Sequence, residues 1–159
     1  MKVTLLVVGK LRGDLAAPVQ DFETRARRYF ALEVADVREE SASRGRSPAR
    51  VMEEEGKRLL ARVPAGAEVV ALDRRGGQWG SVQLARYLEE LGVRSSPGVA
   101  FLIGGAFGLS EEVLGRANHR LSLSALTFPH DLARLVLAEQ LYRAGTILRG
   151  EPYHKGERE

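Results

Sequence analysis

A glycine-rich segment at residues 103–110, IGGAFGLS, has the residue types best suited to binding a ligand. Glycines leave the backbone bare, so a ligand can approach its amide groups closely. The spacing differs from the G-x-G-x-x-G of dinucleotide-binding proteins, and the Lys-Ser/Thr pair of a P-loop is absent from it. A tight turn between a strand and a helix explains the same residues without a ligand. Both interpretations stay open for this segment alone.

A second segment, residues 121–127 (LSLSALT), alternates small apolar and hydroxyl side chains up to Pro129. The alternation predicts a strand, and side chains this small let the backbone pack closely against another segment or a ligand. Small apolar groups and free backbone suit an adenine and an uncharged sugar better than a triphosphate. We see no concentration of cationic side chains for phosphates.

A third segment, residues 73–77 (DRRGG), is predicted to form a turn in which two glycines permit positive φ. Asp73 is suited equally to binding a ribose and to capping this turn.

Titratable candidates are few, because His119, His130 and His154 are the only histidines. They show neither a metal-ligand spacing such as H-x-x-x-H nor a Ser-His-Asp arrangement, so hydrolysis is poorly supported and no metal site is predicted. His119 heads a predicted strand and is expected to be structural. His130 begins the last predicted helix, where a role in a ligand site and a simple surface role are equally open.

Two further candidates lie near the C-terminus. Glu139 sits among apolar residues of the last predicted helix, where it either pairs with Arg143 one turn later or faces an active site. The tail Tyr153-His154-Lys155 brings together a stacking ring, a titratable group and a cation. Chain ends usually fray, so the tail alone is a weak signal.

Strands and helices must position these residues. The sequence indicates them as apolar runs that alternate with amphipathic segments. Strands are predicted at residues 3–8, 32–37, 69–72, 99–103 and 119–123, and helices at residues 18–30, 48–63, 81–91, 110–117 and 129–148. The helix at 110 is expected to be capped by Ser110. This alternation predicts one α/β domain over residues 1–159 with a mostly parallel sheet, and a flexible loop at residues 41–47. Ligands of such sheets bind beyond the carboxyl ends of the strands, where the three segments above would meet.

Composition narrows the functional classes. The chain has 159 residues, 44% of them hydrophobic, which is enough for one core without disulfides. It has no cysteine, which fits a reducing cytosol and a cytoplasmic location. The apolar run at residues 3–8 is too short for a secretion signal, and no run is long enough to span a bilayer. We therefore expect a soluble, unprocessed protein without a membrane partner.

The charge of the chain is a weaker indication of function than its composition. The chain has 24 basic and 21 acidic residues, and arginine dominates the basic ones. Arginine suits phosphate because its planar guanidinium donates two parallel hydrogen bonds. The cluster Arg44, Arg46 and Arg50 therefore fits an RNA contact, but an arginine-rich solvated surface explains it equally well.

Taken together, four motifs resemble one known family. They are IGG-x-x-GLS at 103–110, LSLSALTFPH at 121–130, LYRA at 141–144 and PYHK at 152–155. In this order and spacing they are similar to the SPOUT-superfamily methyltransferases that methylate N3 of a pseudouridine in large-subunit ribosomal RNA. The likeness covers the whole chain. It departs from the family at Ala106-Phe107, where Pro-Glu is common, and at Lys155, where Arg is common.

The resemblance implies a fold, a cofactor and partners. It implies a deep C-terminal trefoil knot that binds S-adenosylmethionine, a homodimer in which one chain's tail completes the other's pocket, and action on assembled ribosomes. Carried over by position, the cofactor residues are Leu72, Asp73, Gly104, Gly105, Leu123, Ser124, Ala125, Leu126, Thr127 and Phe128. The catalytic candidates are Tyr153 and His154 for base positioning or proton removal and Lys155 for a phosphate or developing charge, with His130 and Glu139 in addition.

Two other functions stay open from the sequence. One is a SPOUT methyltransferase that acts on tRNA, although the small size leaves no room for an appended RNA-binding domain. The other is a noncatalytic ribosome-binding module, against which the glycine segment and the tail argue.

Overall fold

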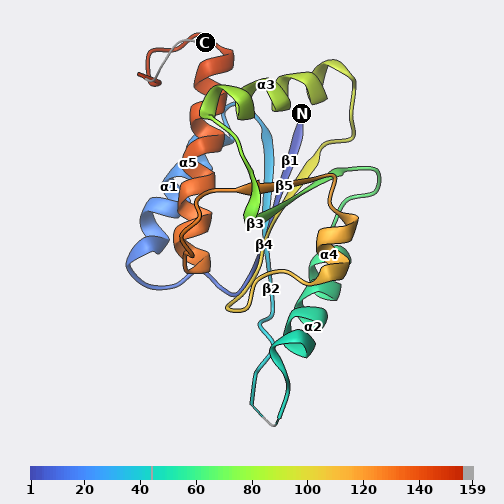
Figure 1. Cartoon of the computed structure of the whole chain (residues 1–159). Coiled ribbons are helices and arrows are strands. Elements are labelled where there is room, and N and C mark those ends of the chain that lie inside the picture. Colours follow the sequence, from blue (N-terminus) through green and yellow to red (C-terminus); the bar gives the residue numbers. More distant parts are fainter. Residues whose placement is uncertain (44, 156–159) are drawn as a thin grey trace.

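Five strands pair in parallel to form one sheet, in the order β2-β1-β4-β3-β5 (Figure 1). The structure is a computed structural model that describes residues 1–43 and 45–155, so Arg44 of the arginine cluster lies outside the described residues. The strands are β1 (Lys2–Val8), β2 (Ala31–Val37), β3 (Glu68–Gln78), β4 (Val99–Ile103) and β5 (His119–Ser122). The predicted α/β architecture with a mostly parallel sheet is confirmed.

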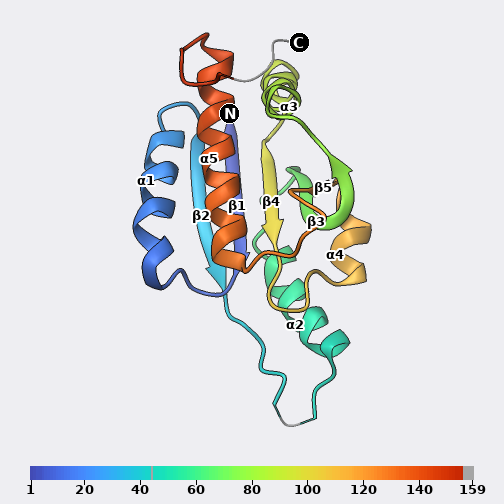
Figure 2. The same cartoon turned by 60° about the vertical axis from the view of Figure 1, so that its left-hand side comes forward.

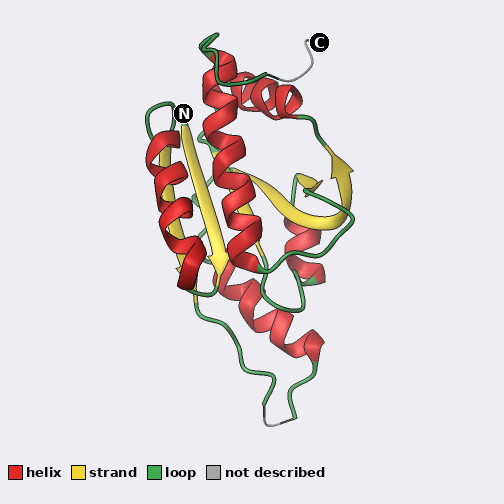
Figure 3. Ribbon diagram, turned by 90° about the vertical axis from the view of Figure 1, so that its left-hand side faces the viewer, coloured by secondary structure: helices red, strands yellow, loops and turns green. Residues whose placement is uncertain are grey.

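Helices cover both faces of the sheet (Figures 2 and 3). One face carries α1 (Ala16–Ala26), α3 (Ser81–Val93) and α5 (His130–Leu148), and a short 3-10 turn, η1 (Gly13–Leu15), precedes α1. The other face carries α2 (Pro48–Leu60) and α4 (Glu111–Arg116). Among the described residues, no helix is long and apolar enough to cross a membrane.

The middle of the sheet is apolar on both sides. In β1, Val3, Leu5 and Val7 pack against the α1/α5 side, whereas Leu6 and Val8 pack against the α2/α4 side. Strands buried on both faces require near-continuous apolar runs rather than alternation. This explains why β1 and β4 were the clearest strands in the sequence.

The predicted turn at residues 73–77 is wrong, because β3 continues through it to Gln78. Neither Gly76 nor Gly77 has positive φ. Gly76 instead permits close approach, since a Cβ there would lie 2.5 Å from the carbonyl oxygen of Arg120. The glycine is needed for close contact between β3 and β5 rather than for a turn.

The predicted strand at residues 121–127 is also only partly correct, because β5 ends at Ser122. The hydroxyl of Ser122 donates to the carbonyl oxygens of Arg74 and Ser124, each at 3.0 Å. These bonds bend the chain at the end of the strand, so the alternating pattern beyond it lies in a loop. Other boundaries differ by a few residues, as at α1, which was predicted at residues 18–30.

Ser110 begins α4 as predicted, and its hydroxyl accepts a hydrogen bond from the amide of Val113 at 3.2 Å. We expect Ser110→Ala to lower the free energy of unfolding by about 1–2 kcal/mol, because the buried amide loses its partner. Urea unfolding measures this loss. Ser47→Ala removes the equivalent but exposed cap of α2 and should cost less; an equal loss for both would contradict the role of burial.

Candidate functional site

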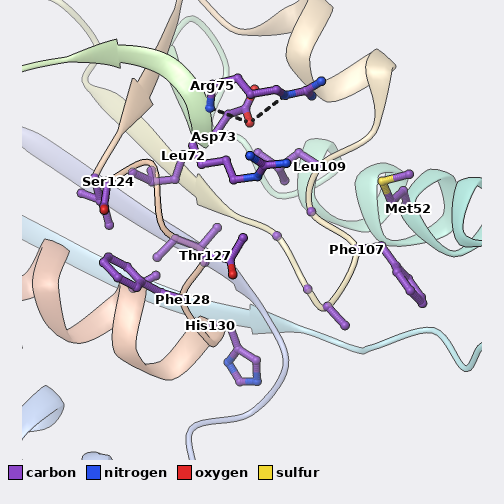
Figure 4. Close-up of a pocket in the computed structure, with 18 of the residues that line it drawn as sticks. Met52, Leu72, Asp73, Arg75, Phe107, Leu109, Ser124, Thr127, Phe128 and His130 are labelled. Carbon is purple, nitrogen blue, oxygen red and sulfur yellow. Dashed lines mark hydrogen bonds and ion pairs between the residues drawn. The ribbon is translucent and has the colours of Figure 1, made fainter.

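A cavity of about 600 Å³ opens at the carboxyl ends of β4 and β5 and beside residues 72–75 in the middle of β3 (Figure 4). The three segments singled out in the sequence line it together, as expected for a parallel sheet. Of the ten predicted cofactor residues, those that line the cavity are Leu72, Asp73, Gly104, Gly105, Leu123, Ser124, Leu126, Thr127 and Phe128. Ala125 is exposed and is not among the lining residues.

The glycine segment forms one wall of the cavity and is tightly closed on itself. The amide of Gly108 donates to the carbonyl oxygen of Gly105 at 3.0 Å, and Gly108 has a φ of +87°. A Cβ on Gly104 would lie 2.7 Å from the backbone carbon of Gly108. The interpretation as a tight turn is therefore confirmed. The bare backbone also lines the cavity, and ligand binding by this segment stays a prediction.

Charged side chains lie on the β3 side of the cavity. Asp73 accepts a hydrogen bond from the amide of Arg75 at 3.3 Å, and its Oδ1 lies 3.5 Å from Nε of the same arginine. The turn that Asp73 was expected to cap is absent, but its carboxylate still bonds the amide two residues later, and ribose binding stays a prediction. Arg74 and Arg75 both line the cavity, which sequence reasoning missed because it treated the loops separately.

The lining fits S-adenosylmethionine, whose adenine is flat and apolar and whose ribose and amino-acid parts are polar. Leu72 of β3 and Leu123 and Phe128 of the loop after β5 supply apolar surface. Ser124 and Thr127 of the same loop supply hydroxyls. The volume lies in the range of pockets that enclose ligands of this size. Glycine backbone on the facing wall leaves room for close approach.

His130 also lines the cavity, so its role in a ligand site gains support over a plain surface role. Its Nδ1 lies 2.9 Å from Oδ1 of Asp131, and its Nε2 lies 3.6 Å from Oε1 of Glu39. A Cβ on Gly9 would lie 3.0 Å from Nε2. The imidazole is therefore held at the edge of the cavity by carboxylates and by the chain that follows β1. His119 instead packs its ring edge-on against Trp79 and Tyr87, which supports its structural role.

The remaining catalytic candidates form a separate cluster on α5. Arg143 donates to Oε1 of Glu139 from Nη2 at 2.6 Å and from Nε at 2.9 Å, so the i+4 pairing of Glu139 is confirmed. Tyr153 donates its hydroxyl to the same oxygen at 3.1 Å, and Arg143 Nη1 lies 3.1 Å from Nδ1 of His154. Burial and the bond to Glu139 raise the pKa of Tyr153. Lys155 is exposed.

The cavity and the tail cluster are far apart within one chain. His130 lies at the first turn of α5, whereas Arg143 lies more than three turns later, about 20 Å along the helix. The structure therefore brings His130 to the predicted cofactor residues but does not bring Tyr153, His154 or Lys155 there.

Sequence reasoning also missed two residues on α2. Met52 lines the cavity, and Phe107 of the glycine segment lies beside it (Figure 4). Glu55 is buried behind Gly105. A signal for Glu55 was present, because it lies one turn from Val51 and one turn from Leu59 on the apolar face of the helix.

The fold and the cavity define an α/β protein with a ligand-sized cavity beside its parallel sheet. The chain belongs to the SPOUT methyltransferase family, since the family model described as "Predicted SPOUT methyltransferase" matches residues 1–154. The family resemblance seen in the motifs is thereby confirmed, and with it the assignment of the chain as a methyltransferase.

Curated relatives match over nearly the full length. A protein of Gemmatimonas aurantiaca named "Ribosomal RNA large subunit methyltransferase H" is 53% identical over 98% of this chain and 100% of its own. A protein of the same name from Rubrobacter xylanophilus is 53% identical over 96% of this chain and 98% of its own. A third, from Clostridium kluyveri, is 39% identical over 98% and 100%.

Two solved structures share the fold at low sequence identity. A methylase-family protein of Haemophilus influenzae is 12% identical, with a TM-score of 0.51 over 99% of this chain and 71% of that one. A protein of Legionella pneumophila named as a methyltransferase, in complex with S-adenosylmethionine, is 14% identical, with a TM-score of 0.50 over 91% of this chain and 66% of that one.

Proposed function

We propose that this protein transfers a methyl group from S-adenosylmethionine to N3 of a pseudouridine in large-subunit ribosomal RNA of assembled ribosomes. The observation that carries the proposal is one cavity that is lined by nine of the ten residues expected to hold the cofactor. The names of the curated relatives support large-subunit ribosomal RNA as the substrate class. A cytoplasmic location follows from this substrate.

The cofactor would be held by the backbone of Gly104 and Gly105 and by the apolar side chains of Leu72, Leu123 and Phe128. When bound, S-adenosylmethionine supplies an electrophilic methyl group on a cationic sulfonium and is left as the neutral thioether S-adenosylhomocysteine. The protein must hold the target base in line with the methyl group and must accept the proton of N3.

We infer that the chain around the cavity forms the trefoil knot. Support comes from β3, which pairs with β5 in two separate registers, first Val70 with His119 and then Gly77 with Leu121. In Figure 2, β3 curves around the segment that follows β5. The close approach of Gly76 to the Arg120 carbonyl allows this wrapping.

We further propose that the active enzyme is a homodimer in which the tail of one chain reaches the cavity of the other. The separation of the tail cluster from the cavity of its own chain supports this arrangement. Leu132, Leu135 and Val136 of α5 are only half-buried, and they lie between the cavity end and the tail end of the helix. A second copy could cover this apolar surface while it supplies the tail.

In such a composite site, His154 is the proposed proton acceptor for N3. Tyr153 is a hydrogen-bond donor rather than a base, because its raised pKa keeps the phenol protonated at neutral pH. Glu139 orients both Tyr153 and Arg143, and Lys155 is placed to contact a phosphate. His130 borders the cavity, where it can orient the base.

We expect His154→Ala to lower the rate of methyl transfer about 100-fold, because the reaction loses its general base. Single-turnover assays with a saturating cofactor measure the rate of the chemical step. Lys155→Ala serves as a comparison and should affect mainly the affinity for RNA. Turnover by His154→Ala close to that of the natural chain would remove His154 from this role.

The function itself is tested by transfer of labelled methyl groups from S-adenosylmethionine to free large subunits, whole ribosomes and tRNA in parallel. The modified nucleoside is then identified by mass spectrometry. Label at N3 of a pseudouridine in whole ribosomes is the expected result. Label only in tRNA would move the substrate, and no label in any RNA would favour a noncatalytic binding module.

A further inference from the structure

Glu55 is a buried carboxylate directly behind the proposed cofactor cavity. It is 3% exposed, on the face of α2 that also buries Val51 and Leu59. Its Oε2 accepts the amide of Glu40 at 3.0 Å. Its Oε1 has no hydrogen-bond partner among the described residues. An unpartnered buried carboxylate oxygen is costly, so its position requires an explanation.

Only one residue separates this carboxylate from the cavity. A Cβ on Gly105 would lie 2.9 Å from Oε1 and 3.2 Å from Oε2 of Glu55, so the carboxylate packs against the α-carbon of Gly105. Gly105 itself lines the cavity. The carboxylate therefore lies directly behind the backbone of Gly105, which lines the cavity.

Among the residues that the structure describes, Glu55 has no direct counter-ion. Arg58 and Arg46 both bind the carboxylate of Glu40, and Glu39 adds a further negative charge nearby. Within the cavity, Asp73 is already paired with Arg75. Because a buried charge is screened weakly by solvent, that of Glu55 extends into the cavity more strongly than that of a surface carboxylate.

We propose that Glu55 is a specificity-determining residue that makes the cavity prefer cationic S-adenosylmethionine over its neutral product, S-adenosylhomocysteine. This inference rests on the proposed function. The two ligands differ by the methyl group and the positive charge on sulfur. In its ionised form, the carboxylate behind the wall favours the charged ligand and so favours release of the neutral product after each turnover.

The test is the affinity of the whole protein for each ligand, measured by titration calorimetry at neutral pH and fixed salt. In Glu55→Gln, the side-chain oxygen can still accept the amide of Glu40, but the charge is gone. We expect the affinity for S-adenosylmethionine to fall about fivefold to tenfold and that for S-adenosylhomocysteine to change less than about twofold. The control is Glu53→Gln, which removes an exposed charge from the same helix and should change neither.

The two affinities distinguish failure of the proposal about Glu55 from failure of the proposed function. An equal loss for both ligands, or no loss for either, would overturn the proposal, because charge would not then discriminate. Failure of the natural chain to bind either ligand would instead contradict the proposed function. The ratio of the two affinities is a readout that a purely structural role of Glu55 would not change.

The stability of the variant follows from the pKa of Glu55. Burial raises the pKa of Glu55, while the amide of Glu40 and the charge of Arg58 oppose the rise and Glu39 and Glu40 add to it. Folding therefore disfavours the ionised form, and stability is lost as pH rises through the raised pKa. Glu55→Gln should consequently be at least as stable as the natural chain at neutral pH, which thermal unfolding checks. Lowering the pH of the natural chain through this pKa should reduce the preference for the cationic ligand.

Discussion

Gly104→Ala is expected to lower the efficiency of methyl transfer about 1,000-fold or more. A Cβ at this position would lie 2.7 Å from the backbone carbon of Gly108 and 2.8 Å from its carbonyl oxygen, and backbone cannot rotate away as a side chain can. Displacing the turn costs up to about 3 kcal/mol, which would appear as a cofactor affinity up to about 100-fold weaker. A cofactor misplaced by about 1 Å loses about another factor of 100 in the chemical step.

Calorimetry with S-adenosylmethionine and single-turnover methyl transfer separate the two losses. Gly115→Ala is the matched control, because no other heavy atom lies within 4 Å of a Cβ there and alanine favours the helix. This control should bind and react like the natural chain. Normal cofactor binding by Gly104→Ala would show that the glycine turn does not form the cofactor site.

The same variant also tests the composite site. In a mixture of Gly104→Ala and His154→Ala chains, some dimers would combine the intact cavity of one chain with the intact tail of the other. We expect such a mixture to recover a substantial part of the activity that each variant lacks alone. A mixture that stays inactive after subunit exchange would place the tail and the cavity in the same chain.

Arg134→Met is expected to lower the free energy of unfolding by about 3–5 kcal/mol. Arg134 of α5 donates to both oxygens of Glu23 of α1, at 2.8 and 3.0 Å, and both side chains are buried. Removal of the arginine leaves a buried carboxylate without its counter-ion. This loss is large compared with the total stability of a domain of this size.

Urea unfolding at one fixed protein concentration measures the effect. The double variant Glu23→Leu/Arg134→Met is the control, since it replaces both charges with apolar groups of similar size. It should be close to the natural chain in stability, because the penalty comes from the unpaired charge. If the single variant were as stable as the double variant, the pair would not be desolvated in the way that the structure indicates.

The sequence predicted most of the sheet because its central strands follow a simple rule. β4 was predicted with its observed bounds, since an apolar run buried on both faces needs no partner information. The three segments that line the cavity were also found, because parallel strands place their carboxyl ends together. The family resemblance identified the class of enzyme, which periodicity alone could not.

Failures arose where residues far apart in sequence share space. Gly76 was assigned to a turn because its contact, the carbonyl of Arg120, lies 44 residues later in the chain. The buried ion pair of Glu23 and Arg134 joins residues that are 111 positions apart, so no local sequence pattern predicts it. Glu55 was also missed, but not because of a distant partner, since its place on the apolar face of α2 was visible in the sequence.

The strand order also has a consequence for how the protein is made. β4 lies between β1 and β3 but is synthesised after both, so those two strands have apolar edges without a neighbour until residue 103 has emerged from the ribosome. Exposed edges of this kind pair readily with other chains. Nascent chains that stall before β4 should therefore aggregate or recruit chaperones, whereas chains that stall after it should retain a soluble sheet core.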